Sequence, residues 1–230
     1  MRLPVVLATV LAAMAWPAAG ALVYQADFED GDVSGWAAQE GRQHETVSVV
    51  GADGGVQPFE GDRCLELRGT HMWNTAELTL DEPVTLDEPV WLWCAWRGEG
   101  PVGQMGLQLL VEGQPRSVYS KTGLVGRLSV GAWDWLVARL DRFDPAVAGG
   151  TLNGLRIVAR CEVGAELPEG RAPEHAVYVD EVHVATGDDA DEAARIAGEQ
   201  GLPREYGGPQ RFTIARQDEV TVWHTPSLAP

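Results

Sequence analysis

Cysteine is scarce in this chain of 230 residues, which contains only Cys64, Cys94 and Cys161. Three cysteines cannot all pair, and the sequence does not choose among the three possible single disulfides. Cys161 follows the apolar phase of residues 155–159, which favours a free, buried thiol. No Cys-x-x-Cys pair occurs and the five histidines show no ligand spacing, so no zinc site is expected.

Basic residues are also few. The chain has 17 lysines and arginines against 34 aspartates and glutamates, which gives a formal net charge of −17. Phosphate backbones and anionic lipid repel a chain this acidic, so we expect neither a nucleic acid nor a membrane partner. Neutral or cationic ligands and metal ions are compatible with the charge. The oligomeric state is not indicated by the sequence.

The apolar run at the start of the chain is too short for a membrane span. It follows Met1-Arg2, extends from Leu3 to Trp16, and ends in the small residues 17–21. A basic start, a short apolar core and an Ala-Gly-Ala end are the three parts of a secretory signal, the alternative being an ordinary N-terminal strand or helix. We therefore expect residues 1–21 to be a signal peptide and the protein to be secreted, to the cell exterior or the periplasm.

Long segments of helical period are absent between residues 22 and 185. Short β-type runs alternate there with Gly, Pro and Asp, which is typical of an all-β sandwich or barrel. We expect one sandwich domain over 22–186 and a linker with a tail over 187–230. The expected strands are 22–28, 46–50, 64–68, 73–80, 90–97, 105–112, 115–120, 134–140, 154–161 and 176–185.

Alternation with a period of two assigns faces to these strands. It turns Glu66, Arg68, Arg156 and Arg160 outward and the apolar residues between them inward. The run 90–96 is apolar on both faces, which predicts a strand covered on both sides.

One hexamer occurs twice without change, at Thr79–Val84 and Thr85–Val90. Two copies are too few for a solenoid, so we interpret them as a local duplication in an edge or connecting segment. Each proline is expected to end a strand, because proline has no N–H for the ladder of hydrogen bonds.

The tail differs in composition from the sandwich. Residues 188–199 are acidic and rich in alanine, which predicts a short helix. Beyond it, residues 211–216 and 219–223 indicate a β-hairpin. A lone hairpin is marginal in water, so it either packs on the sandwich or begins a domain that lies outside this chain.

Catalytic signatures are missing too. The sequence has no Gly-x-Ser-x-Gly elbow, Walker loop or dinucleotide fingerprint, and no Glu-x-Asp-x-x-Glu run of the kind that jelly-roll glucanases carry. Asp180 and Glu181 are adjacent on an expected strand, so they point to opposite faces and make a poor pair of acid and base. We expect no enzyme; Glu181 and His183 are the residues whose mutation would test the opposite view.

A series of landmarks follows a fixed order along the chain. They are Phe28-Glu29-Asp30-Gly31, Gly35-Trp36, Gly61 to Leu67, Trp91 to Trp96, Trp133, and Tyr178 to Val182. Their order and spacing resemble jelly-roll carbohydrate-binding modules, the galactose-binding-domain-like families grouped with xylan- and cellulose-binding modules. The resemblance spans about 22–185 and implies a jelly roll of two antiparallel sheets that binds a polysaccharide or another glycan without catalysis.

The resemblance also implies a structural calcium ion. The family holds it with a glutamate just after the first strand and an aspartate in the last, and these positions correspond to Glu29 and Asp180. Asp27 and carbonyl groups near Gly31 and Asp62 are further candidate ligands. Calcium takes roughly six to eight oxygen ligands, which loops between strands supply. The alternative is that these acids are solvated loop residues.

A segment around Trp73 offers an aromatic face for a pyranose ring and polar groups for its hydroxyls. By the resemblance, Trp73 is the platform, with Arg68, Asn74 and Tyr119 as hydrogen-bonding neighbours. Trp96 is a further candidate for sugar contact. The tryptophans expected in the core are Trp36, Trp91, Trp93 and Trp133.

Two functions of other classes stay open. If all of its tryptophans lie in the core, the sandwich is a structural or adhesive domain that binds protein. If its acids are catalytic, it is a jelly-roll polysaccharide hydrolase or lyase. The tail agrees with an N-terminal module of a larger glycan-processing protein.

Overall fold

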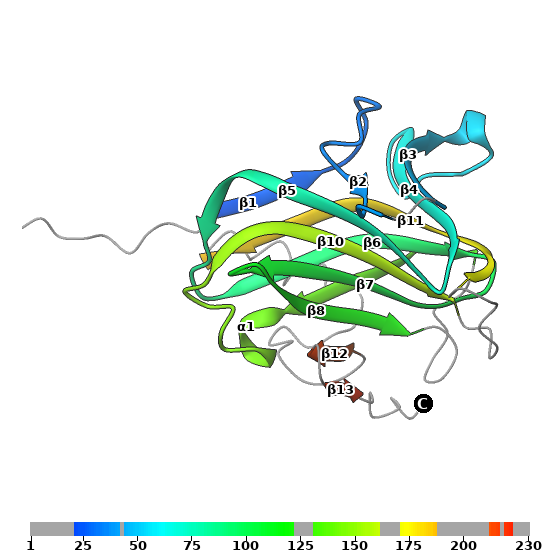
Figure 1. Ribbon diagram of the computed structural model, residues 1–230. Helices are drawn as coiled ribbons and strands as arrows, with labels where there is room; N and C mark the ends of the chain where they lie inside the picture. The colour runs from blue at the N-terminus through cyan, green and yellow to red at the C-terminus, as the bar shows by residue number, and fades with distance from the viewer. Residues whose placement is uncertain are drawn as a thin grey trace, which may run out of the picture.

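The computed structural model describes residues 21–41, 44–121, 131–161, 171–187, 212–216 and 219–222. These residues form two antiparallel β-sheets packed against each other (Figure 1). The predicted all-β jelly-roll sandwich is confirmed. Within these ranges, no helix is both long and apolar enough to cross a membrane.

Six strands form one sheet, sheet A, in the order β3-β4-β11-β6-β9 with β1 beside β11, and seven form the other, sheet B, in the order β13-β12-β8-β7-β10-β5-β2. The strands of sheet A are β1 (Ala21–Ala26), β3 (Glu45–Gly51), β4 (Arg63–His71), β6 (Val90–Glu99), β9 (Asp134–Arg139) and β11 (Arg171–Thr186). Those of sheet B are β2 (Ala37–Ala38), β5 (Trp73–Thr85), β7 (Val102–Val111), β8 (Gln114–Lys121), β10 (Thr151–Cys161), β12 (Phe212–Arg216) and β13 (Glu219–Val222). Two short helices are η1 (Ala52–Gly54) and α1 (Leu140–Phe143).

Alternation along the strands builds one main core between the sheets. Leu65 and Leu67 of β4 are fully buried in it, as are Leu155 and Ile157 of β10. The charged residues between them have their side chains on the outer faces, as predicted. Burial of such side chains is the main favourable contribution to folding.

Strand β6 lies between β11 and β9, and every residue from Val90 to Trp96 is buried. The prediction of a strand covered on both faces is confirmed. The three cysteines are buried and free, so none of the three possible disulfides forms, in agreement with the buried thiol predicted for Cys161.

Strand β11 holds sheet A together, because it pairs with two other strands in succession on one side. Its first part pairs with β4 as far as Val179, opposite Leu65, and its last part pairs with β1 from Val182, opposite Ala26. Between these parts the pairing with β6 shifts register, and Glu181 takes a left-handed backbone conformation with φ of 51°. The first and last strands of the sandwich therefore meet.

The two identical hexamers adopt different structures. The first lies inside β5, whereas the second leaves β5 at Thr85 and reaches β6 at Val90. The expectation that each proline ends a strand is wrong for Pro83, which lies within β5. The ladder between β10 and β5 is interrupted there, between Thr79 opposite Gly154 and Val84 opposite Leu152, and the described residues of β2 pair only beside Ala76 and Glu77. Proline is tolerated at such an edge, where no N–H donor is required.

The predicted hairpin of the tail is confirmed by the pairing of β12 with β13. Strand β12 also pairs with β8, with Phe212 opposite Ser120 and Thr213 opposite Tyr119, so the hairpin extends sheet B. Of the two alternatives, packing on the sandwich is the one observed. The helix predicted over 188–199 lies outside the described residues.

Gly154 allows β10 to approach β5 closely at a shift of their register. A Cβ atom at this position would overlap the carbonyl oxygen of Leu78, which belongs to the neighbouring backbone. We expect Gly154→Ala to destabilise the protein by about 2 kcal/mol or more, because the sheet must distort to admit the methyl group. Chemical denaturation measures the change.

Gly54→Ala is the matched control for this prediction. A Cβ atom at Gly54 meets only Val50, at an ordinary distance of 3.8 Å. If Gly154→Ala and Gly54→Ala unfold at the same denaturant concentration, the close approach of β10 and β5 is not a constraint on this fold.

Candidate functional site

The residues predicted to contact sugar do not share one surface. Trp96 is only 2% exposed and belongs to the core. Asn74 pairs in register with Ala159, and it is fully buried. Its side-chain carbonyl accepts from the N–H of His71 (3.1 Å), and its amide contacts the ring of His175 (3.1 Å). The assignment of Trp96 and Asn74 to a sugar surface is therefore corrected, because both side chains are buried.

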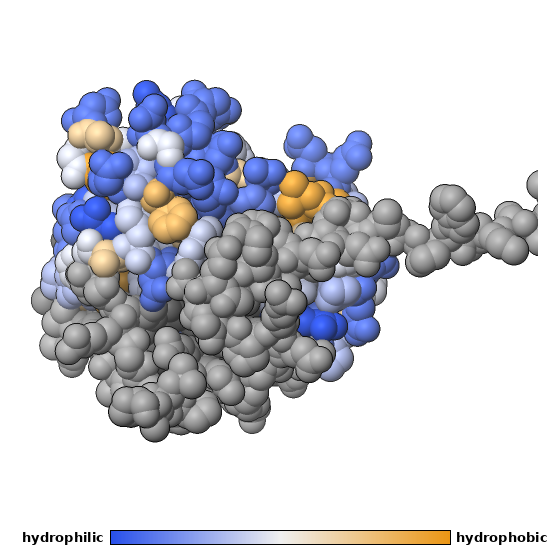
Figure 2. Space-filling model, turned by 180° about the vertical axis from the view of Figure 1, so that it is seen from behind, coloured by the Kyte–Doolittle hydropathy of each residue, from blue (hydrophilic) through white to orange (hydrophobic). Residues whose placement is uncertain are grey.

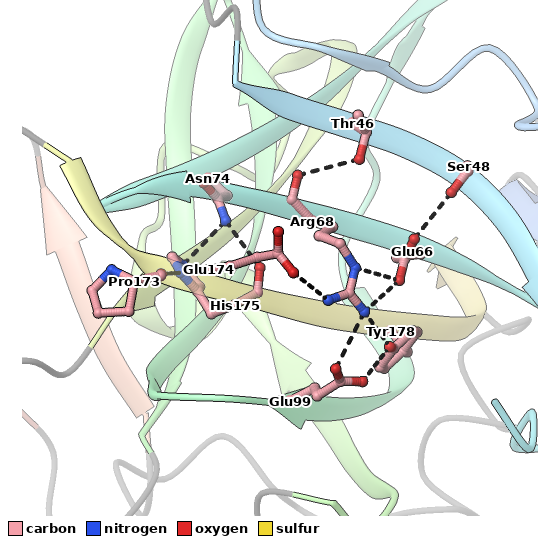
Figure 3. A network of polar contacts seen from close by, with 10 residues as sticks. All are labelled: Thr46, Ser48, Glu66, Arg68, Asn74, Glu99, Pro173, Glu174, His175 and Tyr178. Carbon is pink, nitrogen blue, oxygen red and sulfur yellow. Dashed lines mark hydrogen bonds and ion pairs between the residues drawn. The ribbon is translucent and has the colours of Figure 1, made fainter. Parts of the chain in front are cut away.

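Arg68 of β4 points away from the core on the outer face of sheet A and is held in a network of polar contacts (Figure 3). Its guanidinium contacts the carboxylates of Glu66, Glu99 and Glu174 at 2.8 to 3.3 Å. It also donates to the hydroxyl of Tyr178 (2.8 Å), which in turn donates to Glu99. These contacts occupy Arg68 on the sheet opposite to that of Trp73, so its place beside the platform is corrected as well.

Trp73 begins a row of residues across the outer face of sheet B. It is half-buried and lies outside both core clusters of the described residues. It pairs in register with Arg160, whose guanidinium carbon lies 5.3 Å from the centre of the indole ring. Arg160 pairs next with Gln104 of β7, and Gln104 with Lys121 of β8. This row places an aromatic ring beside a cation on a sheet surface.

A second row on the same face is polar. Glu77 of β5, Arg156 of β10 and Gln108 of β7 pair in register. The guanidinium of Arg156 lies 2.6 Å from Oε1 of Glu77 and 3.4 Å from Oε1 of Gln108. Because both neighbours hold the planar guanidinium, the polar groups of this row have fixed positions, and Gln108 is only 5% exposed.

Between these rows, Thr75, Val158, Gly106 and Tyr119 pair in register across four strands. Gly106 has no side chain, which removes bulk from the middle of the face. The backbone of Tyr119 therefore lies in the sheet that carries Trp73, while its side chain lies outside the described residues. We name the three rows together, from Trp73 to Gln108, the sheet B face.

Sequence reasoning missed Arg160, Arg156 and Gln108 as members of this site. Alternation predicted that both arginines point outward. It did not predict that they share a face with Trp73, because a strand pattern does not reveal which strands are neighbours. The position of β10 between β5 and β7 decides that question.

The carboxylates predicted to bind calcium do gather where β1, β4 and β11 meet. The loop 59–63 bridges them through its backbone. Asp180 accepts from the N–H groups of the first two loop residues (3.1 and 3.2 Å), and Glu29 accepts from those of the last two (3.0 and 3.1 Å). Asp27 accepts from the N–H of Glu29 (3.2 Å). We name this arrangement the strand junction.

The strand junction has the carboxylate oxygens that calcium prefers, and each carboxylate has lone pairs beyond those that the loop uses. In the part of the chain that the structure describes, however, no three Asp, Glu, His or Cys side chains are arranged to hold a metal ion. Calcium at the strand junction therefore stays a prediction.

Burial raises the pKa of Asp180 to about 6; the backbone hydrogen bonds to its carboxylate oppose the rise, and the charge of Glu29 adds to it. Burial also raises the pKa of Glu181 to about 7, and the charges of Asp180, Glu60, Asp27 and Glu29 add to this rise. The folded protein therefore retains protons at pH values where the unfolded chain has lost them.

An acid with a raised pKa stabilises the folded state at low pH, and this stability is lost as the pH rises through the folded pKa. In EDTA, we expect the melting temperature to fall by on the order of 5 °C between about pH 5 and about pH 8. Glu181→Gln should flatten the fall, because glutamine does not ionise. Asp81→Asn, at an exposed acid of β5, is the control. Parallel curves for Glu181→Gln and the unmutated protein would contradict this account.

No protein-family model and no curated protein matches this chain. Among solved structures, the chain is similar to the CBM22-1 xylan-binding domain of Paenibacillus barcinonensis Xyn10C (17% identity, TM-score 0.42, 72% of this chain and 94% of that one). It is similar to CBM28, a module specific for non-crystalline cellulose (12%, 0.46, 72% and 95%). It is also similar to the CBM22-1-GH10 modules of Clostridium thermocellum Xyn10B (12%, 0.48, 73% and 29%). At these identities and TM-scores, the likenesses assign no ligand or activity to this chain.

Proposed function

We propose that this protein binds carbohydrate without catalysis, through the sheet B face. The observation that carries the proposal is the placement of Trp73, a half-buried indole outside the core, beside Arg160 and the polar row of Arg156. An indole stacks on the C–H face of a pyranose, and neighbouring donors and acceptors bind the sugar hydroxyls. Together these groups supply both parts of a glycan site.

The rigidity of the sheet B face supports the proposal. Its side chains stand on β5, β10, β7 and β8, which pair over most of their length. Four strands span roughly 14 Å at the usual spacing, which suits an oligosaccharide better than a single sugar. Groups held in place before binding lose little entropy when the ligand arrives, so a site on paired strands binds more tightly than one on loops.

Export belongs to the same proposal. The expected signal peptide over 1–21 supports secretion, to the cell exterior or the periplasm, where polysaccharides are accessible. We place the chain as a module of a larger secreted protein that processes glycans.

A structural or adhesive role is the alternative from another class. Figure 2 shows the described part of the rear surface as mostly hydrophilic, with small and separate hydrophobic groups. Among the described residues, the large hydrophobic side chains that are exposed are Leu22 and Phe59. Surfaces that bind protein commonly carry larger contiguous apolar patches. This observation favours a sugar ligand over a protein partner.

One observation favours hydrolase or lyase activity as a second candidate. Glu181 combines a left-handed backbone with a raised pKa, and its carboxylate lies 3.8 Å from Nε2 of His183. Both features are common at active sites. Turnover of a polysaccharide panel that is lost in both Glu181→Gln and His183→Ala would favour this activity over binding alone.

A structural calcium ion at the strand junction is also part of the proposal, with Glu29, Asp180 and Asp27 as its ligands. The charges of Glu29 and Asp27 act on Glu181, and that of Glu29 acts on Asp180, in the direction expected of mutual repulsion. A cation bound there would relieve this repulsion and tie β1 to β11.

Trp73→Ala tests the binding site. We expect it to weaken binding to a glycan that the unmutated protein captures on an array by about 30-fold, the effect of losing a central aromatic contact of about 2 kcal/mol. Titration calorimetry measures the affinity. Phe59→Ala removes an exposed ring of the loop 59–63, which contacts Trp135 of β9 in sheet A, and should leave the affinity unchanged. Undiminished binding by Trp73→Ala would place the site elsewhere.

Calcium is tested by its effect on unfolding. At about 100 times its Kd, calcium should stabilise the protein by about 3 kcal/mol, or roughly 5 to 10 °C in melting temperature. Asp180→Asn should abolish this shift, whereas Trp73→Ala should retain it. Equal melting temperatures in calcium and in EDTA would exclude the ion.

A further inference from the structure

The sheet B face differs in charge from the chain as a whole. The described side chains of its rows include Arg156 and Arg160 and one acid, Glu77, in a protein with a formal net charge of −17. Lys121, the chain's only lysine, stands on β8 at the end of the Trp73 row. A local excess of basic residues on an acidic protein calls for a specific reason.

Arg160 differs from those arginines of the described residues that form ion pairs with carboxylates. Arg68, Arg116, Arg139 and Arg156 each contact at least one carboxylate at 3.3 Å or less. Arg160 is exposed, and no carboxylate of the described residues pairs with it. The contact described for its guanidinium is with the indole of Trp73. An aromatic ring holds a guanidinium in place without occupying the donors that a carboxylate would take.

The residues that pair in register with Arg160 do not neutralise its charge. It pairs in register with Trp73 on one side and with Gln104 on the other, both uncharged. Four residues away along β10, Arg156 is already paired with Glu77 at 2.6 Å. The cationic group next to the proposed platform is therefore Arg160.

We propose that the glycan bound at the sheet B face is anionic, and that the carboxylate of a uronic acid residue pairs with Arg160 while a sugar ring lies on Trp73. This inference rests on the proposed function and names its ligand class. The planar guanidinium matches a carboxylate with two parallel hydrogen bonds, which neutral hydroxyls do not reproduce. The acidity of the whole chain does not prevent this pairing, since charges beyond about 8 Å are screened at physiological salt.

The test uses matched sugars that differ in one group. Oligosaccharides of glucose, galactose and mannose are prepared as neutral chains, as chains oxidised to the uronic acid, and as chains sulfated at the same position. We expect the unmutated protein to bind one uronic acid series about tenfold more tightly than its neutral counterpart. Arg160→Gln should remove this preference, so that the affinities for the uronic acid chain and its neutral counterpart differ by less than about twofold.

Control variants distinguish the effect of a charge on the sheet B face from the effect of the net charge of the protein. Arg97→Gln makes the same change of charge on β6 in sheet A, at an arginine that also lies over an aromatic ring (Tyr178, 5.7 Å), and should keep the preference. Arg160→Lys retains the charge but not the planar fork, so it should keep part of the preference. Melting temperatures of the variants show whether each is folded.

The outcomes also separate this inference from the proposed function. Equal affinity for neutral and uronic acid chains, or a stronger preference for sulfated chains, would overturn the uronic acid inference while glycan binding stands. Preference that survives in Arg160→Gln would overturn the role of Arg160. If the protein binds none of these oligosaccharides and gives no signal on a glycan array, the proposed function itself is overturned.

Discussion

Backbone hydrogen bonds from one loop to two carboxylates hold the ends of the sandwich together. The loop 59–63 donates to Glu29, just after β1, and to Asp180, in the middle of β11. Asp180 is almost completely buried, so its bonds to N–H groups satisfy oxygens that would otherwise lack partners. Because β11 pairs with β4, β6 and β1, fixing its centre fixes the whole of sheet A.

The same junction concentrates negative charge, which explains why its stability should depend on pH. Glu181 cannot move away from Asp180, because the two residues are adjacent in β11. Its left-handed backbone conformation is one that residues other than glycine rarely adopt. The closure of the fold therefore has a local energetic cost, which protonation of an acid at the junction would reduce.

Arginine illustrates how partners decide the role of a side chain. Arg68 lies among three carboxylates and a tyrosine, so it stabilises the outer face of sheet A. Arg160 lies against an indole instead, which leaves its charge directed to solvent. Both residues are outward-facing arginines on amphipathic strands. Their different surroundings, and not their residue type, separate a structural contact from a candidate ligand contact.

The sequence by itself determined the all-β class, the faces of β4 and β10 and the buried run of β6, because period-two alternation is a local property. Only the tertiary structure decided that Asn74 and Trp96 face the core, that Arg68 and Trp73 belong to different sheets, and that Arg160 stands beside Trp73. Those facts depend on which strands pair and in which register. The two identical hexamers show the same limit of prediction from local sequence, because one copy forms a strand and the other a connection. Pairing partners that are distant in the sequence select between conformations that the local sequence permits equally.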